Sequence, residues 1–281
     1  MTVWGAIIRK IICILILLWA LPASAQDRLD FLQSIKPQGY HLLQSETLGR
    51  PFHIYVDLPR AYDWGNDKYP VIYLLDGGTM YPLLSSYFLL MTIDEPMPEA
   101  IIVGISYGAT SAADGNFRST DYTAEAKGRD HWGGAPAYLN FLENELLPLI
   151  ETTYRTDTKH RVLFGQSLGG QFAIYAAMTR PELFWGYIAS NPALHRNVDF
   201  FLDLEPARPA NKTHLFIAQG SRDNERFLSP RAAWVTKWTN QTPPWIMAVE
   251  TLEDEYHASA APLAFRAGMR WLFSNDSEVR E

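Results

Sequence analysis

A short apolar stretch in the middle of this chain runs into a glycine-rich turn, and good helix formers follow the turn. Residues 162–164 read VLF, residues 165–170 read GQSLGG, and residues 171–178 favour a helix. The order strand, G-x-S-x-G, helix is typical of a nucleophile elbow, in which a serine sits on a strained turn. Glycines are needed there because side chains at the flanking positions would collide. The pattern predicts that Ser167 is held out at the end of a buried strand as a nucleophile.

Apolar runs with the composition of strands buried on both faces recur along the chain. They alternate with segments of helical spacing at residues 81–92, 135–154 and 261–273. Two opening segments, 39–46 and 50–58, read as antiparallel strands. These features predict a mostly parallel central sheet with antiparallel N-terminal edge strands and helices on both faces, which is the α/β-hydrolase architecture. The buried runs lie at 70–76, 100–105, 162–164, 185–189, 214–218 and 245–250.

The first 25 residues are expected to form a cleavable signal peptide. Arg9 and Lys10 precede an apolar run at 11–20, and the sequence ASA at 23–25 fits a cleavage site after Ala25. The apolar run is too short for a comfortable membrane span. Residues 26–281 are therefore expected to form a single catalytic domain, periplasmic or secreted, without a stable membrane anchor after cleavage.

Charge and composition narrow the classes of partner. The predicted signal peptide holds two of the 24 basic residues and none of the 31 acidic ones, so the net charge falls from −7 to −9 without it. No basic cluster indicates nucleic acid as a partner. The only cysteine, Cys13, lies in the signal peptide, so the mature chain is expected to lack disulfides. We expect no metal site and no cofactor, and the sequence does not indicate an oligomeric state.

Several further motifs fall in a recognisable order. They read YLLDG at 73–77, RSTDY at 118–122, YLNFLENELLP at 138–148, GQSLGG at 165–170, RPELF at 180–184, EYHAS at 255–259 and WLF at 271–273. Together they resemble the putative-esterase family of α/β-hydrolases, which includes enterobactin-type siderophore esterases, S-formylglutathione hydrolases, feruloyl esterases and mycolyltransferases. The siderophore esterases are the most similar group. One departure is Gln166, where many members have histidine, and this position is expected to affect substrate choice.

The base and the acid that would activate Ser167 should follow it in the order serine, carboxylate, histidine. His257 alone among seven histidines lies in the loop between a late strand and the last helix, so we predict that it is the base. His195 is the other histidine that could approach the site. The acid should follow the strand at 214–218, where Asp223 and Glu225 are both candidates. Asp223 is preferred because it resembles the acid of feruloyl esterases, and a Ser–His dyad without an acid stays open.

Two backbone N–H groups are expected to form the oxyanion hole. Leu168, directly after the nucleophile, should supply one and Gly78 the other, because the glycines at 77–78 allow close approach. Asp76 is expected to fix that loop. The walls of the substrate cleft are expected to include Arg118, Tyr107, Tyr122, Trp132 and Gln166. Arg118 could instead form a salt bridge with Asp114 or Asp121.

The function predicted from these residues is an exported serine esterase that forms an acyl-enzyme from a small-molecule ester. The resemblance adds siderophore lactones as candidate substrates. An acyltransferase on the same fold is one alternative, with a hydroxyl replacing water as acceptor. A non-catalytic binding protein that keeps the fold is the other, and the presence of Ser167, His257 and Asp223 together argues against it.

Overall fold

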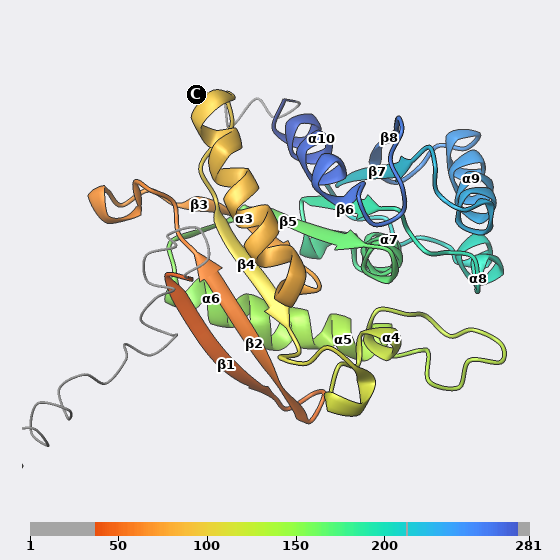
Figure 1. Ribbon diagram of the computed structural model, residues 1–281, viewed down its shortest axis with the longest axis horizontal. Helices are drawn as coiled ribbons and strands as arrows, with labels where there is room; N and C mark the ends of the chain where they lie inside the picture. Colours follow the sequence, from red (N-terminus) through yellow and green to blue (C-terminus); the bar gives the residue numbers. More distant parts are fainter. Residues whose placement is uncertain (1–36, 212, 275–281) are drawn as a thin grey trace, which may run out of the picture. The chain divides into compact units, whose positions relative to one another are not determined.

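The computed structural model describes residues 37–211 and 213–274, and the predicted signal peptide lies outside them. Within these ranges, eight strands form one sheet in the order β1-β2-β4-β3-β5-β6-β7-β8 (Figure 1). β1 and β2 run antiparallel at one edge. The other six strands, β4, β3, β5, β6, β7 and β8 in their order across the sheet, are parallel to one another. The strands are β1 (Gly39–Ser45), β2 (Arg50–Asp57), β3 (Tyr69–Leu74), β4 (Ile101–Ser106), β5 (Thr156–Gln166), β6 (Gly186–Ser190), β7 (His214–Gly220) and β8 (Ile246–Leu252).

The central strands carry apolar side chains on both faces because helices cover both. Every residue of β3 is buried, with Val71 and Tyr73 in one core cluster and Ile72 and Leu74 in the other. This alternation is the two-residue period of a strand. The predicted mostly parallel sheet with antiparallel edge strands and helices on both faces is therefore confirmed.

The two faces of the sheet are covered by different helices. The core cluster on one face includes buried side chains of α3 (Gly77–Asp94) and α10 (Ala261–Ser274), which pack against each other. The cluster on the other face includes buried side chains of five other helices. These are α5 (Ala135–Phe141), α6 (Leu147–Thr153), α7 (Leu168–Thr179), α8 (Val198–Asp203) and α9 (Glu225–Thr239), and a short helix α4 (Arg118–Asp121) precedes α5.

The helices differ from the predicted segments in two places. The helix predicted at 135–154 is present, but a π-helical turn (Leu142–Leu146) joins α5 to α6. Helix α9 is absent from the predicted segments, although it is amphipathic, and Pro230 lies inside it. Its buried side is set by Trp234 and Trp238, which pack on Trp245 at ring-centroid distances of 5.9 and 5.5 Å.

The parallel strands bring distant loops to one edge of the sheet. β3, β5, β7 and β8 all run in the same direction, so their carboxyl ends meet at that edge. The loops that leave these ends contain Asp76, Ser167, Asp223 and His257 respectively. The topology thus assembles one site from residues up to 181 positions apart in the chain.

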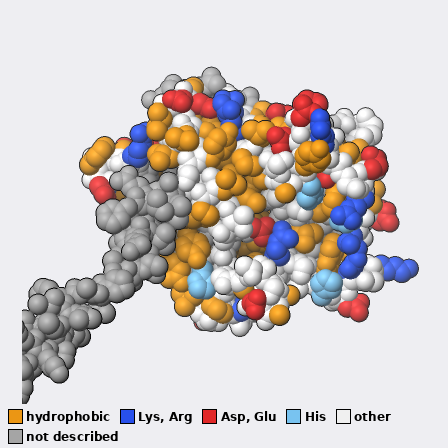
Figure 2. Space-filling view, in the orientation of Figure 1, with side chains coloured by type: hydrophobic (Ala, Val, Ile, Leu, Met, Phe, Trp, Pro, Cys, Tyr) orange, Lys and Arg blue, Asp and Glu red, His pale blue; other side chains and the backbone are white. Residues whose placement is uncertain are grey.

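An apolar stripe stays exposed on α3. Leu83, Leu90 and Ile93 lie on one side of this helix with 45%, 59% and 56% of their surfaces exposed. Figure 2 shows apolar surface on this face of the molecule, together with acidic and basic side chains. Within the described residues, no helix has the length and apolarity that crossing a membrane requires.

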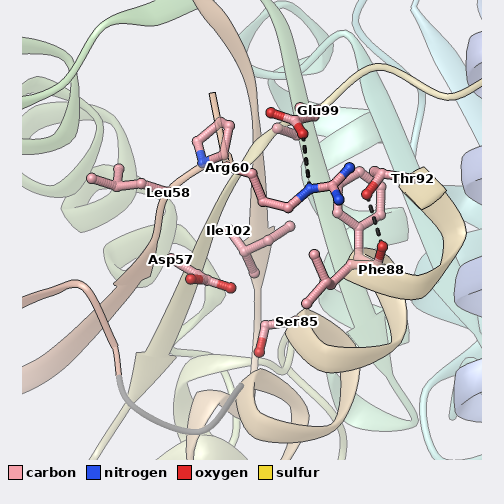
Figure 3. Close-up of a pocket in the computed structure, with 11 residues that line it drawn as sticks. Asp57, Leu58, Arg60, Ser85, Phe88, Thr92, Glu99 and Ile102 are labelled. Carbon is pink, nitrogen blue, oxygen red and sulfur yellow. Dashed lines mark hydrogen bonds and ion pairs between the residues drawn. The ribbon is translucent and has the colours of Figure 1, made fainter. Parts of the chain in front are cut away.

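A small pocket of about 30 Å³ lies where the end of β2 meets α3 and β4 (Figure 3). Asp57 and Ser85 line it, and nearby Arg60 Nε donates a hydrogen bond to Glu99 Oε1 at 3.2 Å. Burial raises the pKa of Asp57 from 3.8 to about 6, although a hydrogen bond from the backbone of Leu58 opposes the rise. The folded protein therefore disfavours the ionised form of this carboxyl group.

Replacing Phe172 by alanine should destabilise the fold strongly. Phe172 is fully buried on α7, with its ring 5.1 Å from that of Tyr138 and 5.9 Å from that of Tyr122. Truncation leaves a cavity, so we expect the free energy of unfolding to fall by about 3–5 kcal/mol in urea denaturation. Trp64→Ala is the control, because Trp64 is 85% exposed and its loss should change stability by less than about 0.5 kcal/mol.

Replacing Asp57 by asparagine should stabilise the protein at high pH only. A carboxyl whose folded pKa is raised contributes stability that is complete below the unfolded pKa of 3.8 and is lost as pH rises through about 6. The variant avoids this loss, so we expect its free energy of unfolding to exceed that of the wild type by about 1–3 kcal/mol at roughly pH 8. Urea denaturation near pH 4 should show little difference. An equal gain at both pH values would contradict the raised pKa.

Candidate active site

Ser167 occupies a strained turn between β5 and α7. β5 ends at Gln166, α7 begins at Leu168, and Ser167 itself has φ 60° and ψ −112°. Such a conformation is costly for a residue with a side chain and persists only where its surroundings enforce it. Here Ser167 N–H donates to the carbonyl of Ser190 at 2.9 Å, and Ala193 N–H donates to the Ser167 carbonyl at 3.1 Å. The turn is thus fixed from the neighbouring strand β6 and the loop after it.

Close packing between strand and helix requires glycine on both sides of the serine. A Cβ atom at Gly165 would lie 2.1 Å from the carbonyl oxygen of Gly169. A Cβ atom at Gly170 would lie 2.7 Å from the carbonyl oxygen of Ser190. The glycines of the motif therefore allow α7 to start directly against the end of β5.

A series of hydrogen bonds links Ser167 to two residues of other loops. His257 Nε2 lies 2.9 Å from Ser167 Oγ, and His257 Nδ1 lies 2.7 Å from Asp223 Oδ2. A carboxylate can only accept, so the proton between them belongs to Nδ1. This tautomer leaves Nε2 as an acceptor for the hydroxyl of Ser167. Asp223 has a buried side chain, 2% exposed, whereas that of His257 is 27% exposed.

Glu225, the alternative acid, lies elsewhere. It is the first residue of α9, it is exposed, and its carboxylate accepts a hydrogen bond from Ser229 one turn later. Asp223 precedes the helix, and its second oxygen accepts from the N–H of Asn224 at 2.7 Å. Of the two carboxylates, the structure brings Asp223 to His257.

The two expected oxyanion donors lie at helix starts. Leu168 is the first residue of α7, and Gly78 is the second residue of α3. N–H groups in the first turn of a helix have no partner within the helix and point toward its N-terminal end. Asp76 precedes α3 in the left-handed conformation, with φ 55°, and its N–H donates to the Tyr122 hydroxyl at 3.2 Å.

A cleft of about 780 Å³ opens beside the elbow. Gln166, which directly precedes Ser167, and Gly78 of α3 are part of its wall, whereas Ser167 and His257 are not among its lining residues. Two of the predicted wall residues, Tyr107 and Arg118, also line it. The cleft shares no lining residue with the small pocket around Asp57. It is the larger of the two spaces, and it meets the elbow strand at Gln166.

Arg118 pairs with a different carboxylate from the two suggested by the sequence. Its Nε and Nη2 lie 2.7 and 2.9 Å from the two oxygens of Asp76, in a bidentate pair. Asp121 instead pairs with Arg50, and Asp114 accepts from Ser111. The alternative considered for Arg118, a salt bridge with Asp114 or Asp121, is therefore wrong. Asp76 is fixed by this pair, which agrees with the structural role expected for it.

Two of the predicted wall residues do not reach the cleft. Tyr122 is fully buried in the aromatic cluster beneath the site, so it supports Asp76 rather than contacting a substrate. Trp132 lines a separate pocket of about 550 Å³ with Phe200. Tyr107 lines the cleft but is only 8% exposed, and its hydroxyl donates to Asp121 at 2.8 Å.

Gln166 connects the elbow strand to the loop of His257. Its Nε2 donates to the backbone carbonyl of His257 at 2.5 Å, and its Oε1 accepts from Ser190 Oγ at 2.5 Å. Gln166 therefore lies in the cleft wall and also holds the histidine loop in place.

Two ring residues complete the surroundings of His257. Phe227 of α9 lies nearly parallel to the imidazole, at a centroid distance of 4.3 Å and an interplanar angle of 23°. His195 meets the same phenyl ring edge-on at 4.6 Å, and burial lowers its pKa below the usual value. Phe227 was not among the residues predicted for the site, and helix α9, which carries it, was not predicted either. Within the described residues, no group of three or more His, Cys, Asp or Glu side chains could hold a metal ion.

Comparisons with known proteins identify the family. A family model described as Putative esterase matches residues 45–262. The ferri-bacillibactin esterase BesA of Bacillus subtilis (strain 168) is 32% identical over 202 residues, which cover 66% of this chain and 65% of the relative. The apo-salmochelin esterase of Escherichia coli O6:H1 (strain CFT073) is 30% identical over 167 residues, which cover 54% of this chain and 51% of the relative. The chain thus spans about two thirds and about half of the lengths of these relatives.

A solved structure shows the same fold. The crystal structure of an IroE-like serine hydrolase from Shewanella oneidensis has a TM-score of 0.71 and 27% identity, and the match covers 84% of this chain and 80% of that chain. The family model covers well over half of the sequence, and the resemblance carried by the motifs is confirmed. The chain belongs to the putative-esterase family of α/β-hydrolases.

Proposed function

We propose that the protein is a serine carboxylic ester hydrolase that works through an acyl-enzyme on Ser167. The observation that carries the proposal is the hydrogen-bonded series from Ser167 Oγ through His257 to Asp223. A serine hydroxyl becomes a good nucleophile when a positioned base removes its proton. The geometry supplies that base at hydrogen-bond distance and a buried carboxylate behind it.

The reaction begins when Ser167 Oγ attacks the ester carbonyl carbon and His257 Nε2 takes its proton. Asp223 accepts the Nδ1–H bond throughout and stabilises the imidazolium that forms. The protonated His257 then gives its proton to the leaving alkoxide as the C–O bond breaks, which leaves the acyl group on Ser167. Water attacks this ester with His257 again as base, and the acid is released as Ser167 recovers its proton.

The negative oxygen of each tetrahedral intermediate needs donors that are already in place. The N–H groups of Leu168 and Gly78 are the proposed pair, since both residues open helices at the edge where the strand loops meet. Gly78 also lines the cleft. The positive ends of two helices would then face the developing charge.

Siderophore esters are the proposed substrate class. The relatives named for ferri-bacillibactin and apo-salmochelin support this choice, and a cleft of about 780 Å³ is large enough for a bulky ester. Arg118 stands in its wall with 32% of its side chain exposed, and its two bonds to Asp76 leave further guanidinium donors. The signal-like sequence of residues 1–25 supports export to the periplasm or the medium.

Replacing Ser167 or His257 by alanine should nearly abolish ester hydrolysis in a folded protein. Loss of the base should lower kcat by about 10²–10⁴-fold. The variants can be compared with the wild type on a short-chain nitrophenyl ester, and a fluorophosphonate probe followed by peptide mass spectrometry should modify Ser167. Less than a tenfold loss in His257→Ala, or a probe adduct on another residue, would contradict the assignment.

The two carboxylates of the β7 loop give a matched test of the acid. Asp223→Asn keeps the size of the side chain but removes the charge that faces His257, so kcat should fall by about 10²–10⁴-fold. Glu225→Gln makes the same chemical change on an exposed side chain and should leave kcat within about twofold. Equal effects of the two changes would contradict the role of Asp223.

The substrate class can be tested separately from the mechanism. An iron-loaded tricatecholate trilactone should be cleaved with a kcat/KM at least about tenfold above that of a nitrophenyl butyrate, because the larger substrate contacts more of the cleft and gains more binding energy in the transition state. Chromatography of the products measures the ring opening. Cleavage of the simple ester alone would leave the serine mechanism intact and rule out this substrate class.

A further inference from the structure

The side chain of Phe227 is placed against the imidazole rather than in the core. It is half-buried, and it belongs to neither of the two core clusters among the described residues. Its ring lies 4.3 Å from the ring of His257 in a stacked arrangement and 4.6 Å from that of His195 edge-on. The guanidinium of Arg226 lies 4.6 Å from the centroid of the same ring. A large apolar side chain is therefore used at the site itself.

Helix α9 presents two different contacts to one imidazole. Asp223 lies just before the helix and accepts from Nδ1 in the plane of the ring, and Phe227 lies in the first turn and covers a face of the ring. Asn224 caps the helix by accepting from the N–H of Arg226 at 3.0 Å. The two contacts therefore come from one short capped segment and keep a fixed relation to each other.

The far end of α9 anchors this segment. Trp234 and Trp238 are 0% and 3% exposed, and both pack on the buried Trp245 next to β8. Phe227 lies seven residues before Trp234, which places both on the same side of the helix. The phenyl ring is thus supported by the core through the helix that carries it.

His257 needs such support because its loop is open to solvent. Its neighbours from residues 253 to 259 are mostly exposed, and its own side chain is 27% exposed. Asp223 and Ser167 bond the two ring nitrogens, but hydrogen bonds in the plane of the ring still allow the imidazole to tilt about the line through these nitrogens. A flat ring stacked on the imidazole face prevents the tilt, and an aromatic face also stabilises the positive charge that the imidazole acquires during the reaction.

We propose that Phe227 is a positioning residue for the base, which holds the His257 imidazole in the plane that faces Ser167 and stabilises its protonated form. This inference rests on the proposed function. It predicts that an aromatic ring at position 227 matters for the chemical steps and that the apolar volume alone does not. Phe227 is not among the residues that line the cleft.

The test compares aromatic and aliphatic side chains at position 227. Phe227→Leu and Phe227→Met fill similar volume without a ring, so they should lower kcat by about 3- to 30-fold with KM within twofold. Phe227→Tyr keeps the ring and should stay within about twofold of the wild type. The rate of fluorophosphonate labelling of Ser167 should fall in parallel, since that step uses the same base without substrate binding. Thermal unfolding of each variant identifies any that fails to fold.

Each outcome distinguishes this inference from the proposed function. Leu228→Ala on the same turn is the control for general disturbance of α9 and should keep the wild-type kcat. If Ser167→Ala is inactive while the Leu and Met variants match the wild type, the role of Phe227 is wrong and the serine mechanism stands. Equal losses in the Tyr, Leu and Met variants, or a change in KM alone, would also overturn it. If Ser167→Ala keeps its activity, the proposed function itself fails.

Discussion

The contact that the rest of the site depends on is the close approach of α7 to the end of β5. There is no room for a side chain at Gly165, since an added Cβ atom there would lie 2.1 Å from the carbonyl oxygen of Gly169. Ser167 takes up the strain of this approach in its positive φ of 60°. The sheet and helix pack tightly enough to maintain that strain, and the result is a hydroxyl held at the carboxyl edge of the sheet.

A second close approach brings the partners of Ser167 together. A Cβ atom at Gly220 would lie 2.1 Å from the carbonyl oxygen of Glu255, so the loop after β7 touches the loop after β8 directly. Backbone bonds join the two loops, with Ser221 N–H donating to Leu252 at 2.9 Å and Arg222 N–H donating to Glu255 at 2.9 Å. Asp223 and His257 therefore reach each other because hydrogen bonds already join the backbones of their loops. Helix α9 begins two residues after Asp223, and this brings Phe227 to the same imidazole.

The sequence predicted those parts of the molecule that depend on local patterns. The strand runs, the elbow around Ser167 and the loop position of His257 follow from periodicity, glycine spacing and chain order, and the fold agrees with them. Contacts between segments that are distant in the sequence could not be predicted from local patterns. Arg118 reaches Asp76 over 42 residues, and Tyr122 is buried where a cleft residue was expected. Helix α9 has apolar residues at helical spacing, but it is absent from the segments predicted from the sequence. The stacking of Phe227 on His257 joins residues 30 positions apart in the chain, and local patterns do not predict such a contact.

The central claim is that Ser167 becomes acylated during turnover. The most direct measurement is intact-protein mass spectrometry of the wild type, quenched with acid during hydrolysis of an ester whose acyl group is released slowly, followed by mapping of the adduct. The account predicts a mass increase equal to one acyl group, carried by the peptide that contains Ser167 and absent from Ser167→Ala. Turnover at full rate with no adduct, or with the adduct on another residue, would contradict it.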